Sequence, residues 1–144
     1  DAMRILGIRG ASITIPFKID VLSCVDEIDP LAMKIGSANT LYNTDKGIKA
    51  FNTDGYGAVA ALKEKNINLS NRRCLVLGSG GAARPIAFYL ADEGAEVTIS
   101  GIDETAARSL ADDLVSIGYS GYIRPDRIRR GVWQQARLRL LHSD

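Results

Sequence analysis

Residues 74–84 read Cys-Leu-Val-Leu-Gly-Ser-Gly-Gly-Ala-Ala-Arg, and the rest of the chain is interpreted outward from them. The apolar run at 75–77 predicts a buried parallel strand. A glycine-rich turn follows at once, and residues 85–94 predict a helix. This order of strand, glycine turn and helix is the context that a dinucleotide-binding fingerprint requires. The alternative is a tight strand-to-helix turn that holds no ligand.

Several positions of the turn have a physical reason within that fingerprint. Gly78 permits the tight turn, and Gly80 lets the main chain approach a pyrophosphate. Ala83 takes the third position, where a small residue lets helix and strand pack closely. The start of the helix also offers free N–H groups and the positive end of its dipole to phosphates. The turn therefore predicts an anion-binding helix start.

Size and composition limit the classes of protein that the chain can represent. It has 144 residues, the size of one ordinary domain, with 46% hydrophobic and 24% charged residues. The formal charge of +1 gives no general indication of a nucleic-acid or membrane partner. No apolar run approaches the roughly 18 residues of a membrane span, and no signal peptide is seen.

The cysteine and histidine content disfavours metal and triad chemistry. Cys24 and Cys74 both lie in apolar segments, which predicts reduced, buried thiols of a cytosolic protein. Their spacing is not that of metal ligands, and His142 is the only histidine of the chain. A zinc site and a Ser-His-Asp triad are therefore disfavoured.

The segment before the fingerprint predicts short mixed elements. Residues 1–10 are expected to form the end of a helix, and further helical pieces are expected at 20–28, 31–35 and 56–65. Strands are expected at 11–15, 37–42 and 48–51, with a hairpin turn between the last two. Pro16 ends the first strand because it cannot donate to a ladder, which puts Lys18 on the following turn. Thr53 or Asp54 is suited to cap the helix at 56–65.

The segment after the fingerprint predicts a second parallel strand at 96–100 and an amphipathic helix at 104–114. The resulting βαβα order is the opening half of a doubly wound sheet. Beyond Gly118 the chain carries six arginines and Trp133, and no third buried strand is expected there. We interpret residues 119–144 as a solvated basic tail, in preference to a nucleic-acid-binding segment.

Four motifs then occur in order and at fitting separations. They are Gly-Ala-Ser-Ile-Thr-Ile-Pro-Phe-Lys (10–18), Ile-Gly-Ser-Ala-Asn-Thr-Leu (35–41), Asn-Thr-Asp-Gly (52–55) and Gly-Ser-Gly-Gly-Ala-Ala (78–83). Together they resemble the shikimate dehydrogenase family, including its quinate/shikimate relatives, over about residues 3–117. The resemblance implies an α/β fold with a partial substrate-binding lobe at 1–56. The first half of a Rossmann-type doubly wound parallel sheet would follow at 57–118, with an atypical tail at 119–144.

The resemblance also implies an activity and a set of site residues. The family interconverts 3-dehydroshikimate and shikimate with NAD(P), in the cytoplasmic pathway to chorismate and the aromatic amino acids. Carried onto this sequence, Lys18 is the catalytic acid/base and Asp54 its partner, and Thr14, Lys18, Asn39 and Asp54 contact the small-molecule substrate. The residues expected to hold the cofactor are Gly78, Ser79, Gly80, Gly81, Ala82 and Asp103. On composition alone, Lys18 would be a surface lysine and Asp54 a helix cap.

Three departures from the family pattern modify this interpretation. The family's upstream Ser-x-Ser motif is absent, and residues 119–144 do not resemble the second half of a Rossmann lobe. We therefore expect a fragment that lacks parts of both lobes, with weak or no turnover and some exposed apolar surface. Gly101, Ile102 and Asp103 replace the Asn-Arg-Thr that is typical of NADP-using members. NADP is the family default, but an acidic residue here suits the free ribose hydroxyl of NAD.

The sequence leaves alternative functions open. The chain can represent a quinate/shikimate dehydrogenase that uses NAD, or an inactive nucleotide-binding fragment. A nucleic-acid binder that acts through the arginine-rich tail is a third alternative, and it would show a steep salt dependence. A homodimer is considered, and the oligomeric state stays open.

Overall fold

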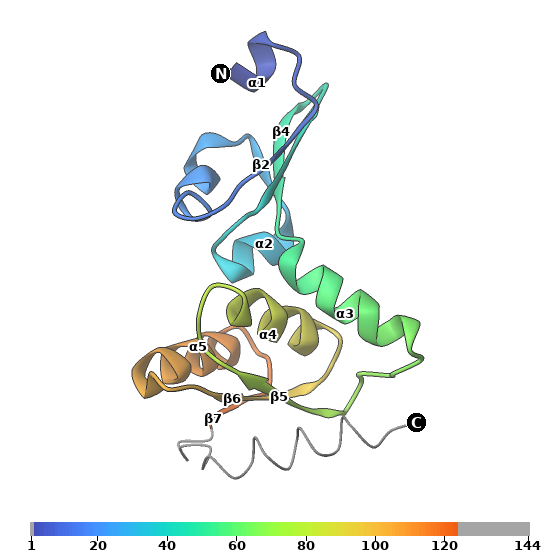
Figure 1. Ribbon diagram of the computed structural model, residues 1–144, viewed down its shortest axis with the longest axis vertical. Helices are drawn as coiled ribbons and strands as arrows, with labels where there is room; N and C mark the ends of the chain where they lie inside the picture. Colours follow the sequence, from blue (N-terminus) through green and yellow to red (C-terminus); the bar gives the residue numbers. More distant parts are fainter. Residues whose placement is uncertain (1, 124–144) are drawn as a thin grey trace.

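Two separate sheets organise residues 2–123, which are the residues that the computed structural model describes. The first is a mixed sheet with the strand order β1-β3-β4-β2, and the second is a three-stranded sheet with the order β5-β6-β7 (Figure 1). The first part contains α1 (Ala2–Ile5), β1 (Gly10–Ser12), the 3-10 helix η1 (Asp20–Cys24), β2 (Glu27–Ile28), α2 (Pro30–Ile35), β3 (Thr40–Thr44) and β4 (Gly47–Phe51). α3 (Asp54–Glu64) connects this part to the second, which contains β5 (Arg73–Leu77), α4 (Ala83–Asp92), β6 (Glu96–Ser100), α5 (Glu104–Ser116) and β7 (Gly121–Ile123).

The second sheet confirms the α/β class and the predicted order of strand, glycine turn and helix. Its three strands are parallel, with Val76 paired to Ile99. Alternate residues of β5 and β6 point toward α4 and α5, where Val76, Val97 and Ile99 are buried together with Phe88 and Leu114. The apolar side chains of 75–77 that point the other way are about half exposed. The two helices therefore cover one face of this sheet.

A third parallel strand corrects the expectation that none follows residue 118. β7 pairs with β6 over three residues, Val97 opposite Gly121. A Cβ atom at Gly121 would lie 2.9 Å from the carbonyl oxygen of Ala111, so only glycine lets this strand pass so close beneath α5. A three-residue strand that begins with glycine carries no apolar run, which is why the sequence pattern missed it. The rest of the expected basic tail, residues 124–144, lies outside the described residues.

The first part confirms some elements and corrects others. The hairpin of β3 and β4 forms as predicted, and so does the helix at 30–35. Asp29 caps that helix by accepting a hydrogen bond from Leu31 N at 3.1 Å, and Gly36 ends it with a φ of 74°. The strand expected at 11–15 ends at Ser12, and a turn with a cis Ile15–Pro16 peptide bond follows it.

The helix expected at 20–28 is wrong. The chain forms only the short 3-10 helix η1, and then β2 pairs in parallel with β4, Glu27 opposite Lys49. Pairing with a neighbouring strand therefore overrides the helical spacing of the apolar residues. The expected burial of both cysteines is also wrong, since Cys24 is exposed and Cys74 is only partly buried. Burial raises the pKa of the Cys74 thiol.

The contact between α3 and α4 joins the two parts (Figure 1). A Cβ atom at Gly55 would lie 2.4 Å from both the carbonyl oxygen of Pro85 and Cδ2 of Tyr89, so the first turn of α3 lies directly against α4. Arg84 Nε adds a hydrogen bond of 2.6 Å to the carbonyl oxygen of Ile35, at the end of α2. The boundary expected at residues 56–57 falls inside α3.

The helices described in residues 2–123 include none with the length and apolar character that a membrane span needs.

Gly55→Ala is expected to lower the free energy of unfolding by about 1–3 kcal/mol, because the added methyl group overlaps main chain that cannot move aside cheaply. Urea denaturation measures the change. Gly57→Ala is the matched control in the same helix, since nothing lies within 4 Å of its added Cβ. There the higher helix propensity of alanine should stabilise by about 0.5–1 kcal/mol. Equal effects of the two substitutions would contradict the close α3–α4 contact.

Candidate active site

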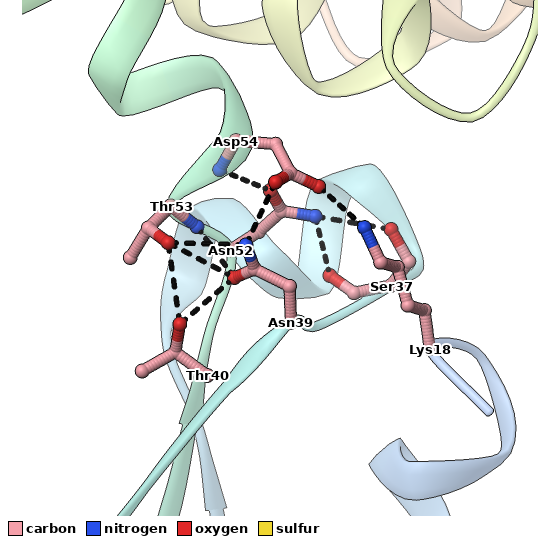
Figure 2. A network of polar contacts seen from close by, with 7 residues as sticks. All are labelled: Lys18, Ser37, Asn39, Thr40, Asn52, Thr53 and Asp54. Atoms are coloured by element: carbon pink, nitrogen blue, oxygen red, sulfur yellow. Dashed lines mark hydrogen bonds and ion pairs between the residues drawn. The ribbon is translucent and has the colours of Figure 1, made fainter. Parts of the chain in front are cut away.

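An ion pair between Lys18 and Asp54 lies at the centre of the candidate site (Figure 2). Lys18 Nζ donates to Asp54 Oδ2 at 2.7 Å, and the two side chains are 27% and 31% exposed. Lys18 lies in the turn after β1, and Asp54 is the first residue of α3, so the two come from distant parts of the sequence. The structure thus brings together the two residues that the sequence singled out for acid/base chemistry. The pair is partly shielded but stays open to solvent.

Asn39 orients the carboxylate of Asp54. Its Nδ2 donates to Asp54 Oδ1 at 2.8 Å and to the Thr53 hydroxyl at 3.1 Å, while its Oδ1 accepts from Thr53 N at 2.8 Å. One carboxylate oxygen of Asp54 therefore faces an amide and the other faces an ammonium (Figure 2). The Thr40 hydroxyl completes this group by donating to Asn39 Oδ1 at 3.0 Å. Such hydroxyl and amide groups are suited to hydrogen-bonding a polyol.

Main-chain hydrogen bonds hold the loop of Asn39 in place. Ile13 N donates to the Asn39 carbonyl at 2.7 Å, and Asn39 N donates to the Phe51 carbonyl at 3.0 Å. One residue earlier, Ala38 N donates to the carbonyl of Lys18 at 2.8 Å. The loop after α2 therefore holds the main chain of Lys18. It also holds Asn39, whose side chain faces Asp54.

A buried asparagine, Asn52, stabilises the site through hydrogen bonds of its side chain. Asn52 is only 1% exposed. Its Nδ2 donates to the carbonyl and the hydroxyl of Ser37, both at 3.1 Å, and its Oδ1 accepts from Asp54 N at 3.2 Å. Reasoning from the sequence assigned no role to this residue or to its partner Ser37, although they lie in the motifs at 52–55 and 35–41.

The expected capping of α3 by Thr53 or Asp54 needs correction. Thr53 holds the capping position, but its side chain makes no capping hydrogen bond and faces Asn39 and Thr40 instead. The N–H of Asp54 is taken by Asn52. Asp54 therefore has both carboxylate oxygens directed toward Lys18 and Asn39, which a capping role would have diverted.

Thr14 does not join this group. Its carbonyl accepts from Phe17 N at 3.0 Å within the turn. Its side chain is exposed, and in the described part of the chain no hydrogen bond joins it to Lys18, Asn39 or Asp54.

The glycine turn has a geometry that fits a phosphate group. Gly78 has a φ of 118°, which favours glycine, and its N–H donates to the Ser100 carbonyl at 2.7 Å. Added Cβ atoms at Gly80 and Gly81 would meet nothing within 4 Å, so the turn faces open space. No side chain caps the start of α4, so the N–H of its first residue, Ala83, is left to an anion, whereas Arg84 N donates to the Gly80 carbonyl at 3.2 Å. The residues present therefore fit the diphosphate of a dinucleotide.

Asp103 has a different contact from the one expected. Its Oδ1 accepts from Ala106 N at 3.0 Å and caps α5. Gly101 lies beside the glycine turn, since an added Cβ there would lie 3.2 Å from Ser79 Oγ. Ile102, between Gly101 and Asp103 in the sequence, is fully exposed. No group of three His, Cys, Asp or Glu side chains within residues 2–123 is arranged to hold a metal ion.

Comparison with known proteins gives one consistent family. Residues 1–41 match the family profile described as the shikimate dehydrogenase substrate binding domain. A shikimate dehydrogenase (NADP(+)) of Haloarcula marismortui is 46% identical over 114 residues, which is 79% of this chain and 42% of that protein. These findings confirm the resemblance to the shikimate dehydrogenase family.

Solved structures agree with the sequence relatives. The Thermus thermophilus shikimate 5-dehydrogenase, in complex with NADP(H) and shikimate, gives a TM-score of 0.69 at 35% identity and covers 81% of this chain and 42% of that one. The Listeria monocytogenes shikimate 5-dehydrogenase, in complex with shikimate and NAD, gives 0.80 at 25% identity, over 99% of this chain and 50% of that one.

The chain is shorter than its relatives. It spans between 31% and 43% of the length of eight curated shikimate dehydrogenases that it matches.

Asn52→Ala is expected to lower the free energy of unfolding by about 2 kcal/mol, because it removes a buried amide and leaves the carbonyl of Ser37 and the N–H of Asp54 without that partner. Chemical denaturation gives the value. Asn68→Ala is the control, since Asn68 is exposed and its side chain only accepts one hydrogen bond, from Ser70 N. A loss at Asn52 no larger than the one at Asn68 would contradict the supporting role of the buried amide.

Proposed function

We propose that this chain, which is similar to the shikimate dehydrogenase family over most of its described length, carries the proton-transfer site of such an enzyme. The reaction is the reversible, NAD(P)-dependent reduction of 3-dehydroshikimate to shikimate. The observation that carries this proposal is the Lys18–Asp54 pair at 2.7 Å, oriented by Asn39. The substrate is therefore a small hydroxylated ring acid.

Lys18 performs the acid/base step. In the direction of reduction, the Lys18 ammonium donates a proton to the carbonyl oxygen of the substrate as that carbon gains a hydride. In the direction of oxidation, the neutral amine accepts the proton of the hydroxyl group. A nicotinamide dinucleotide, when bound, supplies or accepts the hydride.

Asp54 and Asn39 orient the reacting groups. Asp54 holds the ammonium through one oxygen and is itself held by Asn39 through the other. Their partly exposed sides leave hydrogen-bonding capacity for substrate hydroxyls. A site built on such bonds discriminates against ring acids that lack them. We keep Thr14 as a substrate contact, made by its exposed side chain once substrate is bound.

We also propose that NAD is accepted. The relatives are named for NADP(+), and the Listeria structure holds NAD. Residues 101–103 offer no arginine for a 2′-phosphate, and the carboxylate of Asp103 repels one. A Rossmann-type dinucleotide lobe, a cytoplasmic location and a homodimer stay predictions from the resemblance.

Lys18→Ala is expected to lower kcat for shikimate oxidation by at least about 100-fold and to leave dinucleotide binding unchanged, since the acid/base group is lost. Absorbance of the reduced nicotinamide follows the reaction. Lys49→Ala is the matched control. Lys49, on β4, is also 27% exposed, and its Nζ pairs with Glu27 Oε1 at 2.6 Å. Retained turnover in Lys18→Ala would contradict the assignment. Dinucleotide binding by the unaltered protein without any turnover of shikimate would favour the nucleotide-binding fragment instead.

Cofactor preference follows from kcat/KM with NAD and with NADP at equal concentrations. We expect NAD to be used at least as well as NADP. Asp103→Asn should shift the ratio several-fold toward NADP, because it removes the negative charge while asparagine still caps α5. A clear NADP preference of the unaltered protein would overturn the NAD proposal.

A further inference from the structure

Tyr89, on α4, reaches the main chain next to the candidate active site. Its hydroxyl donates to the carbonyl oxygen of Asn52 at 2.6 Å. We propose that Tyr89 is a positioning residue, which fixes Asp54 in the orientation that faces Lys18. The proposal takes the role of Asp54 from the proposed function, but the contacts that carry it do not depend on that function.

The hydrogen bond has the properties of a fixed structural link. Burial raises the pKa of the Tyr89 phenol, so the hydroxyl stays protonated and remains a donor over the working pH range. Its acceptor belongs to Asn52, whose side chain takes the N–H of Asp54. Tyr89 therefore holds Asn52, and Asn52 in turn holds the main chain of Asp54.

The ring of Tyr89 packs against the residue that follows Asp54. Gly55 comes directly after Asp54, and an added Cβ there would lie 2.4 Å from Tyr89 Cδ2. Asp54 thus lies between a residue that accepts a hydrogen bond from Tyr89 and a residue that packs on its ring. Rotation of the first turn of α3 would break both contacts.

A second bond from the same helix supports this arrangement. Arg84 Nε donates to the carbonyl of Ile35, two residues before Ser37. Ser37 is the partner of the Asn52 side chain. One helix, α4, thereby holds both of the segments that Asn52 joins, and this helix starts at the glycine turn. Through α4, Tyr89 links the glycine turn, which fits a diphosphate, to the segment that carries Asp54.

Tyr89→Phe tests the proposal, because it removes the hydroxyl and keeps the ring that packs on Gly55. Tyr56→Phe is the matched control, since Tyr56 is 61% exposed and contacts Tyr89 only through an edge-to-face ring pair at 6.4 Å. Amide hydrogen exchange by NMR is the first measurement. In Tyr89→Phe we expect the protection of the Asp54 amide to fall about 5- to 10-fold, while the β6 amides keep theirs.

Steady-state kinetics is the second measurement. We expect kcat for shikimate oxidation to fall about 5- to 10-fold in Tyr89→Phe, with the KM for the dinucleotide unchanged and Tyr56→Phe like the unaltered protein.

Unchanged Asp54 protection in Tyr89→Phe would overturn the proposal, whatever the activity. An equal loss of protection at β6 would overturn it too, because Tyr89 would then act on overall stability alone. Altered Asp54 exchange in a protein that never turns over shikimate would uphold the positioning contact and contradict the proposed function.

Discussion

The structure of the site depends on one buried amide. A polar side chain taken out of water costs free energy unless its donors and acceptors are satisfied. Asn52 is satisfied through Ser37 on one side and Asp54 N on the other. In residues 2–123 no buried side-chain nitrogen or oxygen lacks a partner. The buried amide thus allows one arrangement of the loop after α2 and the start of α3, and that loop also fixes Lys18.

The two parts of the molecule are joined mainly by packing and by side-chain hydrogen bonds to main-chain carbonyls, from Arg84 to Ile35 and from Tyr89 to Asn52. The ion pair of Lys34 with Asp92, at 3.8 Å, is exposed. Lys63 and Glu93 form an ion pair between the ends of α3 and α4, but their side chains are 53% and 33% exposed. Such exposed pairs contribute about 0–1 kcal/mol each. The direct contact at Gly55 is stricter, because an added Cβ there would overlap main-chain atoms. Steric fit therefore sets how α4 meets the start of α3.

The sequence predicted those elements whose signals are local. The strand 96–100 has alternating apolar residues and the turn 78–83 is rich in glycine, and both formed as expected. The helix predicted at 20–28 and the predicted burial of Cys24 were wrong. The apolar spacing there indicated a helix, but the chain forms a 3-10 helix that ends at Cys24 and then β2, which pairs with the distant strand β4. Lys18 and Asp54 could be singled out only through the family motifs. Asn52 belongs to one of these motifs, but its role could not be predicted, since that role depends on burial and on hydrogen bonds to residues distant in the sequence.

The described residues also separate the two chemical tasks along the chain. The groups suited to proton transfer and to binding hydroxyls lie before or at the start of α3, whereas the turn that fits a diphosphate starts at Gly78. A hydride transfer requires both, so the structure must hold them in a fixed relation. α4 meets this requirement, because its first turn adjoins the glycine turn and its later residues contact Asn52 and Gly55. One helix therefore adjoins the glycine turn at its start and contacts the residues next to Asp54 further along.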